Sequence, residues 1–209
     1  MKIKRFPLGT LWTNCYVLSE ETGNAVVVDP GGPAEDVLAY LDSEKLALQW
    51  ILLTHGHGDH IMGIGDLRAR SAHGVAIGED DAECLTDANA NLSTHMGGET
   101  CFEQADRRLK DGDVLEVGGL RIEVLHTPGH TRGGLCYYVH EQEDALLISG
   151  DTLFARSVGR SDLPGGDESI LIDSLRKLAA LPDSLRVYPG HGPDTTIGEE
   201  RALNPFWPR

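Results

Sequence analysis

The sequence predicts an α/β fold with two sheets or one large mixed sheet. Two observations support this class. Short apolar runs rich in β-formers alternate along the chain with stretches of helical periodicity. The predicted strands outnumber the helices, yet the helices interleave with them, as in sheets covered by helices. The 209 residues fit one ordinary domain, and 40% hydrophobic residues supply a sizeable core. No composition shift marks a linker or a second domain.

The first half of the chain supplies strands and two predicted helices. Pro33 fits the first turn of a helix over 33–41, because proline lacks the N–H that such a turn leaves unpaired. A second helix is expected over 61–70, with Asp59 as a residue able to cap it. The predicted strands of this half cover 15–18, 25–28 and 50–53.

The second half continues the same alternation. Residues 88–105 show no periodicity, which favours a loop or short helices. A helix is expected over 168–180, where apolar residues form a stripe at helical spacing. The predicted strands of this half cover 120–125, 135–139, 145–148 and 185–188.

Charge and targeting signals narrow the partners. A net charge of −15 argues against a nucleic-acid backbone, which requires basic clusters. The basic N-terminus has no apolar stretch behind it, and no segment approaches transmembrane length, so no membrane partner and a cytoplasmic location are expected. The four cysteines form no CxxC pair and are expected as reduced thiols. The sequence does not indicate whether the protein is a monomer or an oligomer.

The strongest functional signal is the run His55-Gly56-His57-Gly58-Asp59-His60, which follows an apolar strand. Imidazole and carboxylate are the ligands that zinc and related divalent cations prefer. The two glycines are expected to let the backbone turn tightly and aim these side chains at one point. The run therefore predicts a metal site.

Other strands also end in metal-binding side chains. The turns after three of them carry His130, Asp151 and His191. Because open α/β sheets place ligand sites at the carboxyl ends of strands, these turns are expected to converge with the 55–60 loop. Asp29 follows a further strand and is expected to accept a hydrogen bond from a ligand imidazole.

Seven ligands divide into two sites that share one carboxylate. We assign His55, His57 and His130 to the first site, and Asp59, His60 and His191 to the second, with Asp151 bridging both. Two divalent ions, zinc or alternatively iron or manganese, would hold a shared water as hydroxide near neutral pH. Asp59 and Asp151 are the expected catalytic residues, since Asp59 would also orient the water.

The chain resembles the metallo-β-lactamase superfamily in Asp29, in Thr-His-Gly-His-Gly-Asp-His at 54–60, and in His130, Asp151 and His191. Within it, the chain is most similar to short thioester hydrolases of the glyoxalase II type, through 14–15, 29–32, 127–131, 158–167, 190–193 and 204–206. The resemblance implies a four-layer αβ/βα sandwich, two mixed sheets flanked by helices, with the metals at one edge.

The resemblance also implies hydrolysis of a small-molecule thioester such as a hydroxyacylglutathione. Arg160 and Arg156, in the loop after Asp151, are candidates to meet an anionic substrate group, although Arg160 is equally suited to an ion pair with Asp162 or Asp167. Full-length glyoxalase II enzymes carry a C-terminal helical domain that contacts glutathione. Residues 1–209 are expected to form a single domain without it.

Rival functions remain from other classes. A persulfide dioxygenase would use a single iron on His55, His130 and Asp151, with open positions for oxygen and substrate. A metal-binding protein without catalysis is a third reading. A β-lactamase is disfavoured without a secretion signal, and a related RNA-processing nuclease is disfavoured by the acidic composition.

Overall fold

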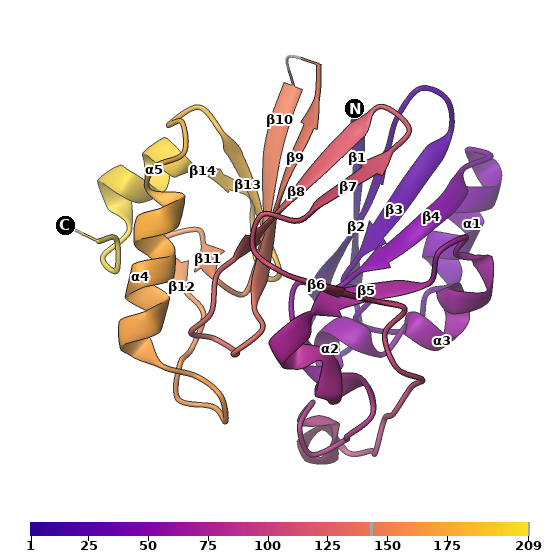
Figure 1. The fold of residues 1–209 in the computed structure, drawn as a ribbon, viewed down its shortest axis with the longest axis horizontal. Coiled ribbons are helices and arrows are strands. Elements are labelled where there is room, and N and C mark those ends of the chain that lie inside the picture. The colour runs from indigo at the N-terminus through magenta and orange to yellow at the C-terminus, as the bar shows by residue number, and fades with distance from the viewer. Residues whose placement is uncertain (143, 209) are drawn as a thin grey trace.

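The protein is described by a computed structural model that covers residues 1–142 and 144–208. Two mixed sheets face each other, and helices cover the outer face of each (Figure 1). This arrangement confirms the predicted α/β class and the two helix-flanked sheets that the resemblance implied. No helix in the described ranges has the length and apolarity to cross a bilayer.

The N-terminal half forms the first sheet, with strand order β1-β2-β3-β4-β5-β6. β3, β4, β5 and β6 run parallel, and β1 and β2 pair antiparallel. The strands are β1 (Lys2–Leu8), β2 (Thr13–Ser19), β3 (Asn24–Val28), β4 (Ala47–Leu52), β5 (Val75–Gly78) and β6 (Arg107–Leu109). The helices are α1 (Glu35–Ser43), α2 (Gly58–Ile61) and α3 (Ile64–Leu67), with 3₁₀ segments at Arg68–Arg70, Glu79–Leu85 and Ser93–Met96.

The C-terminal half forms the second sheet, with strand order β14-β13-β10-β9-β8-β7. Only β10 and β13 pair in parallel within the described part of this sheet. The strands are β7 (Val114–Val117), β8 (Leu120–His126), β9 (Leu135–Glu141), β10 (Asp144–Gly150), β13 (Arg186–Pro189) and β14 (Thr195–Thr196). A separate hairpin pairs β11 (Leu153–Phe154) with β12 (Ser157–Val158), and the helices are α4 (Glu168–Leu178) and α5 (Ile197–Leu203).

Side chains that alternate between the two faces of each strand form the separate layers of the core. In β2, Cys15 and Val17 pack toward the helices of the first half, whereas Tyr16 and Leu18 pack into the core between the sheets. Successive side chains of a strand point to opposite faces, so a strand covered on both faces reads as a continuous apolar run. A third cluster lies between the second sheet and α4 and includes Leu175.

Several strands were not predicted. β5, β6 and β7 have three or four residues, too short to show a period, and two of the three residues of β6 are arginines. β1 lies at the sheet edge and does not alternate strictly, because Lys4 and Arg5 are both exposed. Its basic residues obscured the pattern.

The continuous helix predicted over 61–70 was wrong. The chain instead forms α2, α3 and a 3₁₀ turn. Gly63 lies at the break, where its N–H donates to the Pro30 carbonyl at 2.7 Å and a Cβ would lie 2.3 Å from the Gly32 oxygen. Asp59 lies within α2 rather than capping it, since His57 takes the N-cap position. Likewise, α1 begins two residues after Pro33.

The two sheets meet along one edge, near the carboxyl ends of β3, β4, β10 and β13. The Asn14 N–H donates to the Gly190 carbonyl at 2.7 Å, which joins the first sheet to the turn after β13. The Leu135 N–H donates to the Thr54 carbonyl, also at 2.7 Å, which joins β9 to the end of β4. Loops from both sheets therefore converge at this edge.

Candidate metal centre

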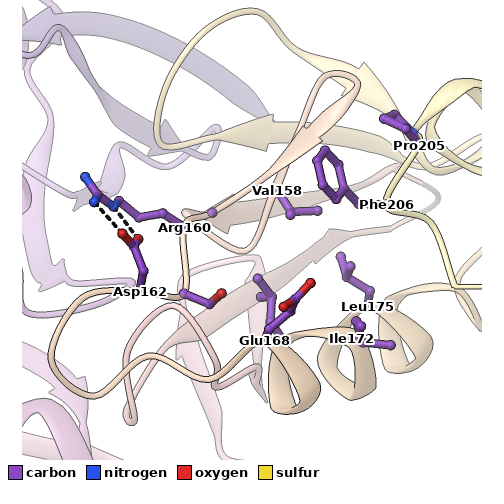
Figure 2. Close-up of a pocket in the computed structure, with 11 residues that line it drawn as sticks. Val158, Arg160, Asp162, Glu168, Ile172, Leu175, Pro205 and Phe206 are labelled. Atoms are coloured by element: carbon purple, nitrogen blue, oxygen red, sulfur yellow. Dashed lines mark hydrogen bonds and ion pairs between the residues drawn. The ribbon is translucent and has the colours of Figure 1, made fainter.

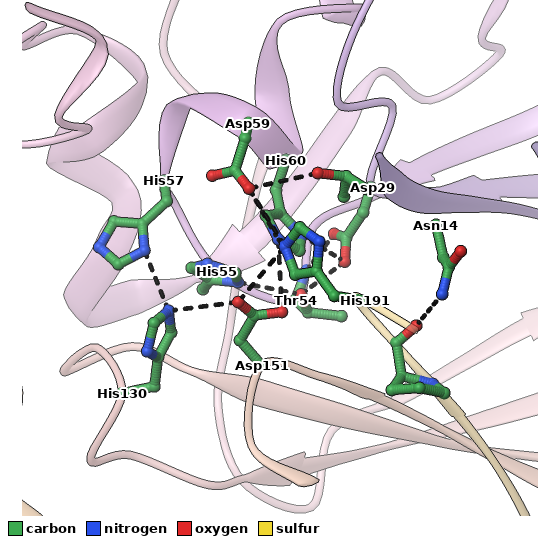
Figure 3. A network of polar contacts seen from close by, with 12 residues as sticks. Asn14, Asp29, Thr54, His55, His57, Asp59, His60, His130, Asp151 and His191 are labelled. Atoms are coloured by element: carbon green, nitrogen blue, oxygen red, sulfur yellow. Dashed lines mark hydrogen bonds and ion pairs between the residues drawn. The ribbon is translucent and has the colours of Figure 1, made fainter. Parts of the chain in front are cut away.

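The seven side chains predicted as metal ligands lie together at this edge (Figure 3). They come from the loop after β4 and from the turns after β8, β10 and β13. All four are short connections at strand ends, where the rigid sheet fixes the position of the connecting residues. The side chains are His55, His57, Asp59, His60, His130, Asp151 and His191.

The first predicted group is compact. The Nδ1 atom of His57 lies 3.0 Å from the Nε2 atom of His130. The His55 ring lies 4.7 Å from the His57 ring and 4.8 Å from the His130 ring, between centroids. One ligand atom from each residue falls within 4.8 Å of the others, so a single ion can reach all three.

The second predicted group is equally close. The Nε2 atoms of His60 and His191 lie 3.3 Å apart. The Oδ2 atom of Asp59 lies 3.2 Å from the Nε2 atom of His191 and 3.6 Å from that of His60. These three ligand atoms also fall within 4.8 Å of one another.

Asp151 lies between the two groups. Its Oδ1 atom is 3.4 Å from the Nε2 atom of His60, and its Oδ2 atom is 3.7 Å from that of His130. Oδ2 also lies 3.6 Å from the Nε2 atom of His191. The carboxylate therefore reaches both groups, as bridging requires.

Hydrogen bonds on the outer nitrogens orient three of the imidazoles. The Nδ1 atom of His130 donates to the Arg160 carbonyl at 2.7 Å, and that of His191 donates to the Leu11 carbonyl at 3.2 Å. The Nδ1 atom of His60 lies 3.0 Å from Asp29 Oδ2. With Nδ1 donating, the Nε2 lone pair of each ring is directed into the cluster, as in many metal sites.

Asp29 and Thr54 form hydrogen bonds on the side of His60 that faces away from the other ligands. Asp29 accepts the Thr54 N–H at 2.7 Å and the Thr54 hydroxyl at 2.6 Å, besides the bond from His60. Asp29 has a φ of 51°, a left-handed conformation that aspartate tolerates better than most residues. The sequence predicted this place for Asp29 but not the contribution of Thr54.

Electrostatics keep most of these groups in the form that binds metal. Burial lowers the pKa of His57 to about 3, helped by the nearby His130, and burial likewise lowers the pKa of His55. Burial alone would raise the pKa of Asp59 and Asp151, but the surrounding histidines, His60 first, lower both. Metals bind neutral imidazoles and ionised carboxylates, so these residues are prepared for them.

The donor set fits a divalent cation. The Nε2 atom of His55 and the Oδ1 atom of Asp151 are buried and have no hydrogen-bond partner among the described residues. Burial of a polar atom without a hydrogen-bond partner costs free energy of folding. A cation bound between these two atoms would offset that cost. Five imidazoles and two carboxylates suit zinc, iron or manganese.

Sequence reasoning missed the residues that hold the turns in place. Asn14 donates from Nδ2 to the Pro189 and Gly192 carbonyls at 3.0 and 2.9 Å, on either side of His191. The Tyr16 hydroxyl donates to the same Pro189 carbonyl at 2.8 Å. These contacts cross between sheets, so no local pattern announces them.

Asp81 is a further buried carboxylate that the sequence did not single out. It is 3% exposed and accepts three hydrogen bonds, from the Gly56 and Gly133 N–H groups and from the Thr131 hydroxyl. Burial raises its pKa, while these donors oppose the shift. It follows β5, so the strand-end rule would have found it had β5 been predicted.

The glycines of the 55–60 run act differently from the prediction. Neither has a positive φ, so the expected tight turn was the wrong reason for them. A Cβ on Gly56 would lie 2.3 Å from the Cβ of Cys84, and one on Gly58 would lie 3.1 Å from the Met96 sulfur. They are needed because the 79–96 segment packs directly against the loop.

The two predicted substrate arginines lie outside the group of seven predicted ligands, although the Arg160 carbonyl accepts the His130 hydrogen bond. Arg160 pairs with Asp162 through two hydrogen bonds of 2.7 and 2.8 Å, at one end of a cavity of about 510 Å³ beside α4 (Figure 2). Arg156 lines a separate cavity with Asp194, Glu199 and Glu200, which contains none of the seven ligands. Contact of either arginine with an anionic substrate group stays a prediction.

Arg132 is the arginine beside the cluster. It lines a cavity of about 210 Å³ together with His57, Thr131 and Gly165. Its side chain makes no ion pair within the described residues. Asp80 and Glu83 line the same cavity, which therefore offers partners to an ammonium as well as to a carboxylate.

Comparison with known proteins places this geometry in a family. The family model described as "Metallo-beta-lactamase superfamily" matches residues 9–191. The probable metallo-hydrolase YqgX of Bacillus subtilis is 36% identical, over 99% of this chain and 97% of its own. The hydroxyacylglutathione hydrolase GloC of Haemophilus influenzae is 34% identical, over 99% and 98%.

Solved structures agree with the sequence relatives. BLEG-1, titled a B3 metallo-β-lactamase, superposes with a TM-score of 0.93 at 41% identity and covers 99% of both chains. TTHA1623 in a di-iron-bound form gives 0.83 at 36% identity, over 97% of this chain and 99% of its own. ETHE1 from Myxococcus xanthus gives 0.80 at 33% identity, over 98% and 84%.

Proposed function

The chain belongs to the metallo-β-lactamase superfamily, and from that premise we propose that it is a metal-dependent hydrolase of a thioester such as a hydroxyacylglutathione. One observation carries the proposal: seven metal-binding side chains form two groups with Asp151 between them. A single ion on His55, His130 and Asp151 would leave four of these seven side chains without a metal. Two ions are therefore the better match.

The proposed ligands are His55, His57 and His130 for one ion and Asp59, His60 and His191 for the other, with Asp151 shared. When bound, such ions lower the pKa of a shared water and polarise a carbonyl group. TTHA1623, which binds two irons, supports a two-metal centre. Zinc, iron and manganese all suit the ligands proposed here.

Asp59 is proposed to orient the attacking water as well as to bind metal. Its Oδ2 atom accepts a hydrogen bond from the Thr13 hydroxyl at 3.2 Å, which fixes the carboxylate. The lowered pKa keeps Asp59 ionised at neutral pH, so its carboxylate can accept a hydrogen bond from the water and orient it. A thiolate leaving group has a parent pKa of about 8.5 and departs without a strong acid. This fits a cluster with no spare general acid.

The substrate assignment is supported by the hydroxyacylglutathione hydrolase GloC, which matches this chain over 98% of its own length. A relative of nearly the same extent thus carries that name without a further large domain. We propose the glutathione thioester as the first substrate class on this ground. The cavity beside Arg132 offers the charged partners that such a molecule requires.

Each of two other functions is supported by one similar solved structure. ETHE1 keeps the predicted alternative open, an iron-dependent persulfide dioxygenase on His55, His130 and Asp151. BLEG-1 brings in β-lactam hydrolysis, which the sequence disfavoured. The two-group geometry favours hydrolysis over the dioxygenase, because the dioxygenase needs one ion and three ligands.

Metal content and turnover test the proposal together. Metal-loaded protein is expected to hold two ions and to hydrolyse S-lactoylglutathione, with loss of turnover after chelation and in His57→Ala or Asp151→Ala. A panel with a β-lactam and a glutathione persulfide under oxygen separates the alternatives. Two ions without thioester turnover would contradict the substrate, and one iron with oxygen consumption would establish the dioxygenase. Protein that takes up only trace metal would overturn the metal site itself.

A further inference from the structure

We infer that Asp81 is a positioning residue that holds the His55–His57–His130 group in place, independently of the Asp59–His60–His191 group. The inference rests on the proposed two-metal site. It assigns to Asp81 the control of one ion of the two.

Asp81 joins the two loops that supply the first group. Its Oδ2 atom accepts the Gly56 N–H at 3.1 Å and the Thr131 hydroxyl at 2.7 Å. Its Oδ1 atom accepts the Gly133 N–H at 2.7 Å. Gly56 separates His55 from His57, and Thr131 follows His130 directly. One carboxylate thus fixes the backbone beside all three imidazoles.

The fit around Asp81 leaves little room for adjustment. A Cβ on Gly133 would lie 2.3 Å from the Asp81 nitrogen, and one on Gly78 would lie 2.1 Å from the Gly133 oxygen. The 3₁₀ segment Glu79–Leu85 and the 130–133 turn therefore touch backbone to backbone. Asp81 makes no ion pair within the described residues, so its buried charge depends on these three donors.

The second group has its own buried carboxylate. Asp29 holds the ring of His60 and the backbone of Thr54, and it makes none of the contacts of Asp81. Asp81 therefore holds the loops of the first group, and Asp29 holds the ring of His60 in the second. Asp29 also reaches His55 through the Thr54 hydroxyl, which lies 3.2 Å from His55 Nδ1. Outer residues of this kind typically change metal affinity 10–100-fold when mutated. The two ions are expected to respond to different mutations.

Asp81→Asn tests the inference with the least change of shape. An amide nitrogen cannot accept a hydrogen bond, so either the Gly56 or the Gly133 N–H loses its partner. We expect one of two Zn²⁺ ions to bind about 10–100-fold more weakly in chelator competition, and the other to keep its affinity. The Co²⁺-loaded variant should lose the paramagnetically shifted NMR signals of His57 and His130 and retain those of His60 and His191.

Two controls separate positioning from general damage. Asp80→Asn changes the exposed neighbour, which makes none of these hydrogen bonds, and should bind both ions normally. Asp29→Asn should weaken most the ion that His60 binds, because Asp29 contacts the His60 ring directly and reaches His55 only through Thr54. Unfolding of the metal-free proteins checks that each variant folds. If Asp81→Asn does not fold, Thr131→Val removes one of the three bonds and should weaken the same ion, while Thr131→Ser restores it.

Two results would overturn the inference. In the first, Asp81→Asn or Thr131→Val binds both ions with the affinity of the unmodified protein. In the second, the variant binds both ions more weakly by the same factor. Unmodified protein that binds fewer than two ions would contradict the two-metal proposal instead. The outcomes therefore distinguish a wrong role for Asp81 from a wrong metal centre.

Discussion

Arg132 is the residue whose charge bears most directly on substrate choice. It lies two positions after His130, lines the cavity beside His57 and has no ion pair in the described part of the chain. A hydrogen bond to a charged partner is worth about 1.5–3 kcal/mol, or roughly tenfold in affinity or more. Arg132→Ala should therefore raise KM for an anionic thioester about tenfold and leave kcat nearly unchanged.

The measurement is steady-state hydrolysis of S-lactoylglutathione and of an uncharged thioester by the same preparations. Arg121→Ala is the matched control, since Arg121 is exposed at the start of β8, far along the strand from His126, and pairs with Glu116. An equal rise in KM for both substrates would show that Arg132 supports the fold rather than the anion. A change in kcat alone would place it elsewhere in the reaction.

At the scale of residues, the sequence predicted those site residues whose position follows from a local pattern. The seven candidate ligands lie in the connections after apolar strands, so each could be found by reading strand ends. Asp29 could be found in the same way. Asp81 could not, because β5 is too short to recognise. Asn14 and Tyr16 act on a turn some 170 positions away, and only the folded chain brings them there.

At the scale of elements, Glu20 fixes the hairpin between β2 and β3. Its carboxylate accepts hydrogen bonds from the N–H groups and side chains of Thr22 and Asn24. Desolvation would raise the pKa of Glu20, but these bonds lower it from 4.5 to about 2. The stabilisation is therefore present above pH 4.5 and is lost as the pH falls toward 2.

Glu20→Gln should lower the free energy of unfolding at pH 7 by about 1–2 kcal/mol, because an amide replaces a charged acceptor of several bonds. The difference from the unmodified protein should shrink as the pH falls from 4.5 toward 2. Urea unfolding at several pH values measures it. Glu21→Gln alters an exposed neighbour and should have little effect at any pH. A difference that persists at pH 2 would contradict the assigned carboxylate role.

The elements that the sequence predicted best have strong periodicity or a clear cap. α4 begins after Asp167, whose side chain accepts the Ser169 and Ile170 N–H groups, close to the expected start at 168. The helix expected over 61–70 failed for a tertiary reason. Gly63 must approach Pro30 and Gly32, and that contact breaks a pattern that is locally helical. Such contacts are invisible to periodicity.

At the scale of the whole molecule, each candidate ion would tie the two sheets together. His55 and His57 follow β4 of the first sheet, whereas His130 follows β8 of the second. The other group draws Asp59 and His60 from the first sheet and His191 from the second. Metal binding therefore stabilises an interface between two halves of the chain, beyond the local loops.

Removal of metal should consequently lower the melting temperature of the entire protein in one cooperative transition. An ion at 100 times its Kd adds about 2.7 kcal/mol, and 1 kcal/mol shifts Tm by about 2–4 °C for a chain of this size. We expect chelation to lower Tm by about 5–10 °C for each ion lost. Calorimetry of loaded and chelated protein measures the shift.

His191→Ala sharpens the test, because it removes the second-sheet ligand of one group and leaves Asp59 and His60 in place. Its loaded form should gain only the stabilisation from the remaining ion, whereas its chelated form should melt near the chelated unmodified protein. Equal melting temperatures for loaded and chelated unmodified protein would contradict the coupling. Two separate transitions after chelation would show that the sheets unfold independently, and that the ions rather than the apolar core between the sheets make the two halves cooperative.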